Sequence, residues 1–167
     1  LNPKFPDALA GLGSAFEELG KNKEALSYLM KAVEADPLNS EYWYMLADIQ
    51  YTIDMISESV LSYQKVSQLD PDNEDIWLDY SHACFVAENE TKALEILKKG
   101  IEKQPFNYSL QYRQANYTIH NGCMQEAMQV LGNALMLDYS KHQELLDYDP
   151  ELVKNTGVMD LIELYKK

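Results

Sequence analysis

Large apolar residues recur at helical spacing along the whole chain, in stretches of about 12 to 14 residues that are separated by short polar breaks. One clear pair of stretches carries, in chain order, Trp43, Leu46, Ala47, Ser59, Tyr63 and Val66. No segment alternates with period two for long enough to suggest a strand. The pattern therefore predicts an all-α fold built from helical hairpins.

Four of the six prolines lie at a fixed interval of 34 residues: Pro3, Pro37, Pro71 and Pro105. Each proline is followed by polar or turn residues, so each is expected to close a helix and open a turn. Self-similarity at a constant interval of this length indicates an array of repeats.

The repeated positions resemble the tetratricopeptide repeat, which reads W-x2-L-G-x2-Y, then A-x3-F, then P. The second repeat holds in these positions Trp43, Leu46, Ala47, Gln50, Ser59, Tyr63 and Pro71. The third holds Trp77, Tyr80, Ser81, Cys84, Ala93, Leu97 and Pro105. Small residues recur at two positions, where the helices of a hairpin must approach closely: Gly13, Ala47, Ser81 and Ala115, then Ala25, Ser59, Ala93 and Ala127.

The resemblance implies a right-handed α-solenoid, or superhelix, of four repeats: residues 6–39, 40–73, 74–107 and a degenerate 108–141. Residues 1–5 are then the end of a preceding repeat, which indicates a piece of a longer array. The tail is also similar to the endings of tetratricopeptide proteins from Bacteroidetes bacteria, so the resemblance implies a bacterial protein.

Residues 142–167 depart from the repeat pattern. Asp149 and Pro150 are typical of a helix start, and one face of a later helix carries Val158, Leu161, Ile162 and Tyr165. A stacked array leaves its last apolar face uncovered, so this tail is predicted to form C-terminal capping helices. The alternative is that the tail reaches back into the groove and regulates it.

In this family, the first helix of each repeat lines the inner surface of the superhelix. The resemblance therefore implies a partner-binding groove formed by Tyr44, Asp48, Tyr51, Leu78, Asp79, His82, Phe85, Tyr112, Arg113 and Asn116. Aromatic side chains give large contact area, and Asp48 and Asp79 are suited to pair with Lys or Arg on an extended or helical peptide. The alternative is that the aromatic residues only pack between neighbouring repeats.

Charge narrows the range of partners. The chain has 27 Asp and Glu against 14 Lys and Arg, a net charge of -13, while 46% hydrophobic residues indicate a folded chain. A surface this negative repels phosphate backbones and anionic lipids, so neither nucleic acid nor a membrane surface is expected as partner. No apolar run is long enough to predict membrane insertion. A basic or apolar segment of a protein or peptide is the expected partner.

The sequence contains no constellation for catalysis, because no phosphate loop, nucleophile elbow or zinc-binding helix is recognisable. His120 and Cys123 lie three residues apart, but Gly122 interrupts the helix and two further ligands are missing, so neither a metal nor a cofactor is predicted. Co-chaperones of the family hold a C-terminal carboxylate with Lys, Asn and Arg. The same positions here include Asp48, Asp75 and Asp79, so a chaperone carboxylate clamp is not expected.

The leading prediction is thus a non-catalytic protein-interaction scaffold that binds a peptide or protein in its concave groove. The alternatives are a structural module that forms homo-oligomers, or an array that recruits substrate for an enzymatic domain preceding residue 1. The chain begins at Leu1, so an upstream targeting signal would not be visible. The cytoplasm is the expected compartment, and the periplasm stays open.

Overall fold

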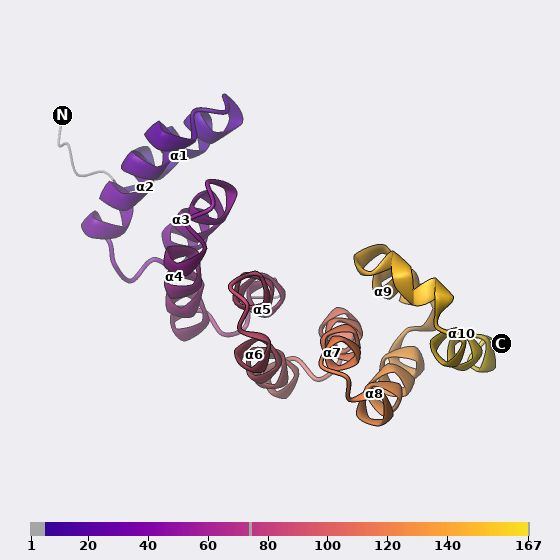
Figure 1. Cartoon of the computed structure of the whole chain (residues 1–167). Coiled ribbons are helices and arrows are strands. Elements are labelled where there is room, and N and C mark those ends of the chain that lie inside the picture. Colours follow the sequence, from indigo (N-terminus) through magenta and orange to yellow (C-terminus); the bar gives the residue numbers. More distant parts are fainter. Residues whose placement is uncertain (1–5, 74, 167) are drawn as a thin grey trace. The chain divides into compact units, whose positions relative to one another are not determined.

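The computed structural model describes residues 6–73 and 75–166, which are helical throughout apart from turns and short connections (Figure 1). The prediction of an all-α fold is confirmed. The chain divides into two compact parts, here called the N-terminal part, up to Glu88, and the C-terminal part, from Asn89. This division falls inside the predicted third repeat, between its two helices. The predicted end of a preceding repeat, residues 1–5, lies outside the described residues.

The N-terminal part contains α1 (Pro6–Glu18), α2 (Asn22–Ala35), α3 (Ser40–Thr52), α4 (Ile56–Leu69) and α5 (Ile76–Val86). Helices α1 and α2 form one hairpin and α3 and α4 the next, while α3 also packs on α2 and α5 on α4. The hairpin core includes Leu29, Val33, Leu46 and Ile49. An added Cβ at Gly13 would lie 2.6 Å from the Leu29 Cγ, so this small position is required by the close approach of α1 and α2.

The C-terminal part contains α6 (Glu90–Lys103), α7 (Tyr108–His120), α8 (Met124–Leu137), α9 (Gln143–Tyr148) and α10 (Thr156–Leu164). Two 3-10 helices, η1 (Tyr139–Lys141) and η2 (Pro150–Lys154), connect the last elements. Helices α7 and α8 form a hairpin, α9 packs on α7, and α10 packs on α8. The tail contributes Leu145, Leu146, Leu152, Val158 and Ile162 to the core of this part.

The turns after the prolines share one hydrogen-bonding scheme. The side-chain oxygens of Asn39, Asn73 and Asn107 each accept two backbone N–H groups at the start of the next helix, which satisfies donors that an α-helix leaves unpaired. The carbonyl oxygens of the prolines accept a side-chain N–H from six residues further on, namely Trp43, Trp77 and Gln111. Helix caps and turns therefore repeat every 34 residues, as the apolar positions do.

The connections between paired helices also recur at this interval. Gly20, Asp54, Glu88 and Gly122 all have positive φ, with values of 68°, 65°, 56° and 76°. Residues with a Cβ adopt this conformation at a cost of about 1 to 2 kcal/mol. Two of the four connections thus use a residue that the backbone geometry disfavours.

Introducing glycine at one of these positions and removing it from another should change stability in opposite directions. We expect Glu88→Gly to raise the free energy of unfolding by about 0.5 kcal/mol, because relief of the left-handed conformation outweighs the added freedom of the unfolded chain. We expect Gly122→Ala to lower it by about 1 kcal/mol for the same reason, since no atom lies within 4 Å of the added Cβ. Urea unfolding measures both, and changes of equal sign would contradict the conformational explanation.

Candidate functional site

Side chains of α3 and α5 meet on one face of the N-terminal part. The Tyr44 hydroxyl donates to the Asp79 carboxylate, and the Tyr51 hydroxyl lies 2.9 Å from His82 Nε2, with the rings 5.6 Å apart. The structure thus brings together four of the residues predicted to line the groove. All four are partly buried.

Asp48 is held on the same face by a residue that sequence reasoning did not select. The hydroxyl of Tyr63, from α4, donates to Asp48 Oδ1 at 2.5 Å, and the Tyr63 ring packs edge-to-face on Tyr44 with the centroids 5.9 Å apart. Tyr63 occupies a core position of the repeat, where the family pattern has Phe. The extra hydroxyl is the one signal in the sequence that could have indicated its second contact.

The pKa of the Asp48 carboxyl is raised to about 6, chiefly by burial; the Tyr63 hydrogen bond opposes this shift, and the neighbouring carboxylates of Asp79 and Glu17 add to it. Burial is likewise the first cause that raises the pKa of Tyr44 and of Tyr63, followed at Tyr44 by the hydrogen bond to Asp79 and at Tyr63 by the charge of Asp48. Within the described residues, no Lys or Arg forms an ion pair with Asp48. This face therefore concentrates negative charge beside aromatic rings.

Leu78 and Phe85 lie on α5 and are also partly buried. The hydrogen bonds of Tyr44 and Tyr51 connect α3 with α5, the first helices of consecutive repeats. This agrees with the alternative prediction that the aromatic residues pack between neighbouring repeats. Both rings nevertheless keep part of their surface accessible. The face, here called the α3–α5 face, consists of Tyr44, Asp48, Tyr51, Asp79 and His82, with Glu17 and Tyr63 beside it.

The prediction that Tyr112 and Asn116 line an accessible groove is wrong. Tyr112 is 1% exposed, belongs to the core of the C-terminal part and donates its hydroxyl to the Asp138 carbonyl at 2.9 Å. Asn116 is completely buried. Arg113 is half-buried, and its guanidinium lies 3.6 Å from the ring centroid of Tyr148, which belongs to α9.

Tyr112 and Asn116 are inaccessible because α9 packs against α7. Ser109 Oγ donates to Glu144 Oε2 at 2.6 Å, and the hydroxyls of Tyr117 and Tyr148 lie 3.0 Å apart. These pairs are separated by 35 and 31 residues, as are the pairs Tyr44–Asp79 and Tyr51–His82. Helix α9 therefore stands where the first helix of a fifth repeat would stand, and it covers the α7 residues that the sequence assigned to the groove.

Among the described residues, no cluster of three or more His, Cys, Asp and Glu side chains is placed to hold a metal ion. His120 Nε2 lies 3.3 Å from Asp149 Oδ2, and Cys123 is exposed at the hairpin tip. None of the helices in residues 6–73 and 75–166 combines the length and the apolar character that crossing a membrane requires.

Comparison with known proteins agrees with this architecture. Two family models described as tetratricopeptide repeat match residues 6–49 and 40–73. An N-terminal acetyltransferase A complex subunit-like protein of Schizosaccharomyces pombe is 30% identical over 80 residues, which are 48% of this chain but only 12% of that relative.

Among solved structures, a crystal structure of MamA has a TM-score of 0.75 at 21% identity and covers 85% of this chain and 78% of its own. The structure of YrrB, described as a tetratricopeptide-repeat protein with an unusual peptide-binding site, has a TM-score of 0.70 at 15% identity. It covers 99% of this chain and 88% of its own. Likeness at this identity shows the fold, that of tetratricopeptide α-solenoids.

The repeated turns, the hairpins and the matches to both sequence families and solved folds lead to one conclusion. Residues 6–73 match tetratricopeptide-repeat models and the described chain has the fold of tetratricopeptide α-solenoids, repeats that generally serve as protein-interaction modules.

Proposed function

We propose that the α3–α5 face binds an extended segment of a protein partner, and that this segment carries a Lys or Arg next to an apolar residue. The observation that carries the proposal is Asp48, a largely buried carboxylate without an ion-pair partner among the described residues. Burial of an ionised carboxylate costs free energy that an arriving cation offsets.

The surroundings of Asp48 favour the same kind of ligand. Asp79 and Glu17 add negative charge near it, and the rings of Tyr44 and Tyr51 supply apolar contact with few rotatable bonds. A guanidinium or ammonium group placed against these rings also gains attraction to their faces. Charge selects the segment, and the aromatic surface holds its apolar neighbour.

The test uses an array of 12-residue peptides that contain proline, so that they stay extended, with Lys or Arg beside Leu. Matched peptides carry Glu in place of the cation. We expect the basic set to bind and the acidic set not to bind. For the best binder, measured by fluorescence anisotropy, the Asp48→Asn and Asp79→Asn double variant should weaken affinity at least tenfold and flatten its salt dependence.

The matched control is the Glu18→Gln and Glu24→Gln double variant, which removes the same charge from exposed positions and should change affinity less than twofold. Binding should also weaken as the pH falls from 7 to 5, because a carboxyl with a pKa of about 6 is protonated over that interval. Unchanged affinity and salt dependence in the Asp variant would contradict the proposal.

Self-association is a second candidate, because α1 has an uncovered face. Leu12 and Ala15 are exposed, whereas the residues 34 positions further on, Leu46 and Ile49, are buried in the core that α3 shares with α2. Another helix placed on α1 would cover the same positions. Light scattering distinguishes this candidate, since a monomer at every concentration would remove it.

A further inference from the structure

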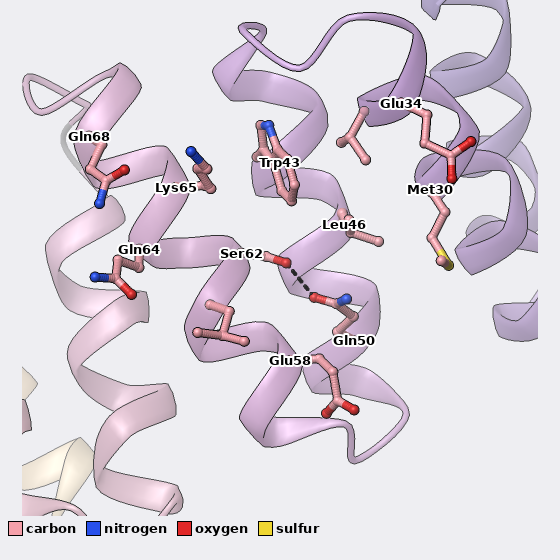
Figure 2. A pocket seen from close by; sticks show the side chains of 12 residues that line it. Met30, Glu34, Trp43, Leu46, Gln50, Glu58, Ser62, Gln64, Lys65 and Gln68 are labelled. Atoms are coloured by element: carbon pink, nitrogen blue, oxygen red, sulfur yellow. Dashed lines mark hydrogen bonds between the residues drawn. The ribbon is translucent and has the colours of Figure 1, made fainter.

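A hollow lies on a different face of α3 from Tyr44 and Asp48. It is a cavity of about 610 Å³ between α2 and α4, with α3 as its floor (Figure 2). Met30 projects from α2, Leu61 from α4, and Trp43 and Leu46 rise from the floor. Its volume lies within the range of sites that bind ligands, about 300 to 1,000 Å³. We call it the α2–α4 groove.

The apolar walls of this groove are not a requirement of the repeat. Met30 is 47% exposed and Leu61 is 63% exposed. At intervals of 34 residues, the counterparts of Met30 are Gln64, Lys98 and Gly132, and those of Leu61 are Ser27, Glu95 and Gln129. Only between α2 and α4 do both facing positions hold large apolar side chains. Exposed apolar surface that the fold does not need marks an interaction site.

One polar group is buried at the floor. Gln50 is 8% exposed, and its Oε1 accepts a hydrogen bond from Ser62 Oγ at 2.6 Å (Figure 2). No residue in 6–73 or 75–166 accepts a hydrogen bond from its amide nitrogen. The floor of the groove therefore holds one amide fixed by a hydrogen bond beside Trp43 and Leu46, while Gln64, Lys65 and Gln68 lie on the α4 wall.

We propose that the α2–α4 groove binds the apolar face of an amphipathic helix of a partner protein, flanked by Lys or Arg. An extended peptide would bring a row of backbone N–H and C=O groups to a groove that buries one amide at its floor, carries its other polar side chains on the helical walls and has no sheet edge to pair with. A helix satisfies these groups internally. From Glu58 to Gln68, the α4 wall is about 15 Å long, which accommodates about ten residues of helix.

Charge indicates the sign of the partner. Glu34 and Glu58 stand on opposite walls of the groove with a single cation, Lys65. Residues 6–73 contain 12 Asp and Glu against 4 Lys and Arg, a net charge of -8. A helix with cationic flanks is attracted to this surface, whereas an acidic helix or a second copy of this acidic chain is repelled.

The probe is a fluorescein-labelled 14-residue peptide with Leu at positions i, i+3, i+4 and i+7 and Lys at most other positions. One control peptide has the same composition with the Leu residues distributed around the helix, and another has Glu for Lys. In fluorescence anisotropy, we expect the first peptide to bind at least tenfold more tightly than either control.

The matched protein variants separate this groove from other exposed apolar residues. The Met30→Ser and Leu61→Ser double variant should weaken binding at least tenfold, while Leu38→Ser and Met136→Ser, at positions 76% and 66% exposed, should change it less than twofold. All four positions are exposed, so circular dichroism should show unchanged helix content. Glu34→Gln with Glu58→Gln should weaken binding and reduce its salt dependence.

Equal binding of the redistributed peptide, or equal loss in the control variant, would overturn the proposal. Loss on Asp48→Asn with Asp79→Asn, and not on the groove variant, would assign the peptide to the α3–α5 face. A dimer that dissociates on Met30→Ser with Leu61→Ser would make the occupant a second copy. Since the two faces have separate probes and variants, failure here leaves the proposal for the α3–α5 face intact.

Discussion

Removal of residues 143–167 should unfold the C-terminal part. Five tail side chains lie in its core: Leu145, Leu146, Leu152, Val158 and Ile162. Burial of an aliphatic side chain of this kind contributes about 1.5 to 3 kcal/mol, so five of them contribute roughly 10 kcal/mol, as much as the whole stability of an ordinary domain. Helices α7 and α8 cannot retain their packing without that contribution.

Circular dichroism during thermal unfolding and hydrogen exchange at the α7 and α8 amides measure the outcome. If the truncated chain aggregates, a single core substitution in the full chain gives the same information. Ile162→Ala should lower the free energy of unfolding by about 2 to 4 kcal/mol. Leu164→Ala, at a position 77% exposed, should change it by less than about 0.5 kcal/mol. A truncated chain with protected α7 amides and tighter peptide binding would instead make the tail a regulator of the groove.

The regular features of the fold follow from the sequence because they depend on residues near one another in the chain. The proline interval located the turns, and the small positions that were expected to allow close helix approach, such as Ala25, Ala47 and Ser81, are all buried. The asparagine caps also lie within three residues of the donors they satisfy. Local spacing and local hydrogen bonds are therefore sufficient for this part of the prediction.

The errors concern contacts between distant residues. Arg113 and Tyr148 are brought together by α9, a helix of only six residues whose sequence lacks the repeat motif, so its place in the register is not visible in the pattern. Tyr63 was assigned to the core, where its ring does lie, but its hydroxyl reaches Asp48 on another helix. The α2–α4 groove could not be predicted from the family pattern, because that pattern assigns binding to the first helix of each repeat, whereas Met30 and Leu61 lie on the second helices α2 and α4.

Replacement of Asn116 by leucine should stabilise the C-terminal part. Asn116 is completely buried, and neither Oδ1 nor Nδ2 has a hydrogen-bond partner among the described residues. Each buried polar group left unsatisfied costs about 1 to 3 kcal/mol. Leucine has a similar volume and no polar atom, so we expect Asn116→Leu to raise the free energy of unfolding by about 1 to 3 kcal/mol.

Asn107, the N-cap of the same helix, provides a control for which the expected change in stability has the opposite sign. Its side chain accepts from the N–H groups of Ser109 and Leu110, so Asn107→Ala should lower stability by about 1 kcal/mol. Urea unfolding of the two variants compares an asparagine that satisfies donors with one that satisfies none. If Asn116→Leu is instead destabilising, the amide of Asn116 must be bonded in solution, for instance to a buried water, and the cost inferred for it would not exist. The two substitutions therefore test whether hydrogen bonding, rather than residue type, decides what an asparagine contributes to α7.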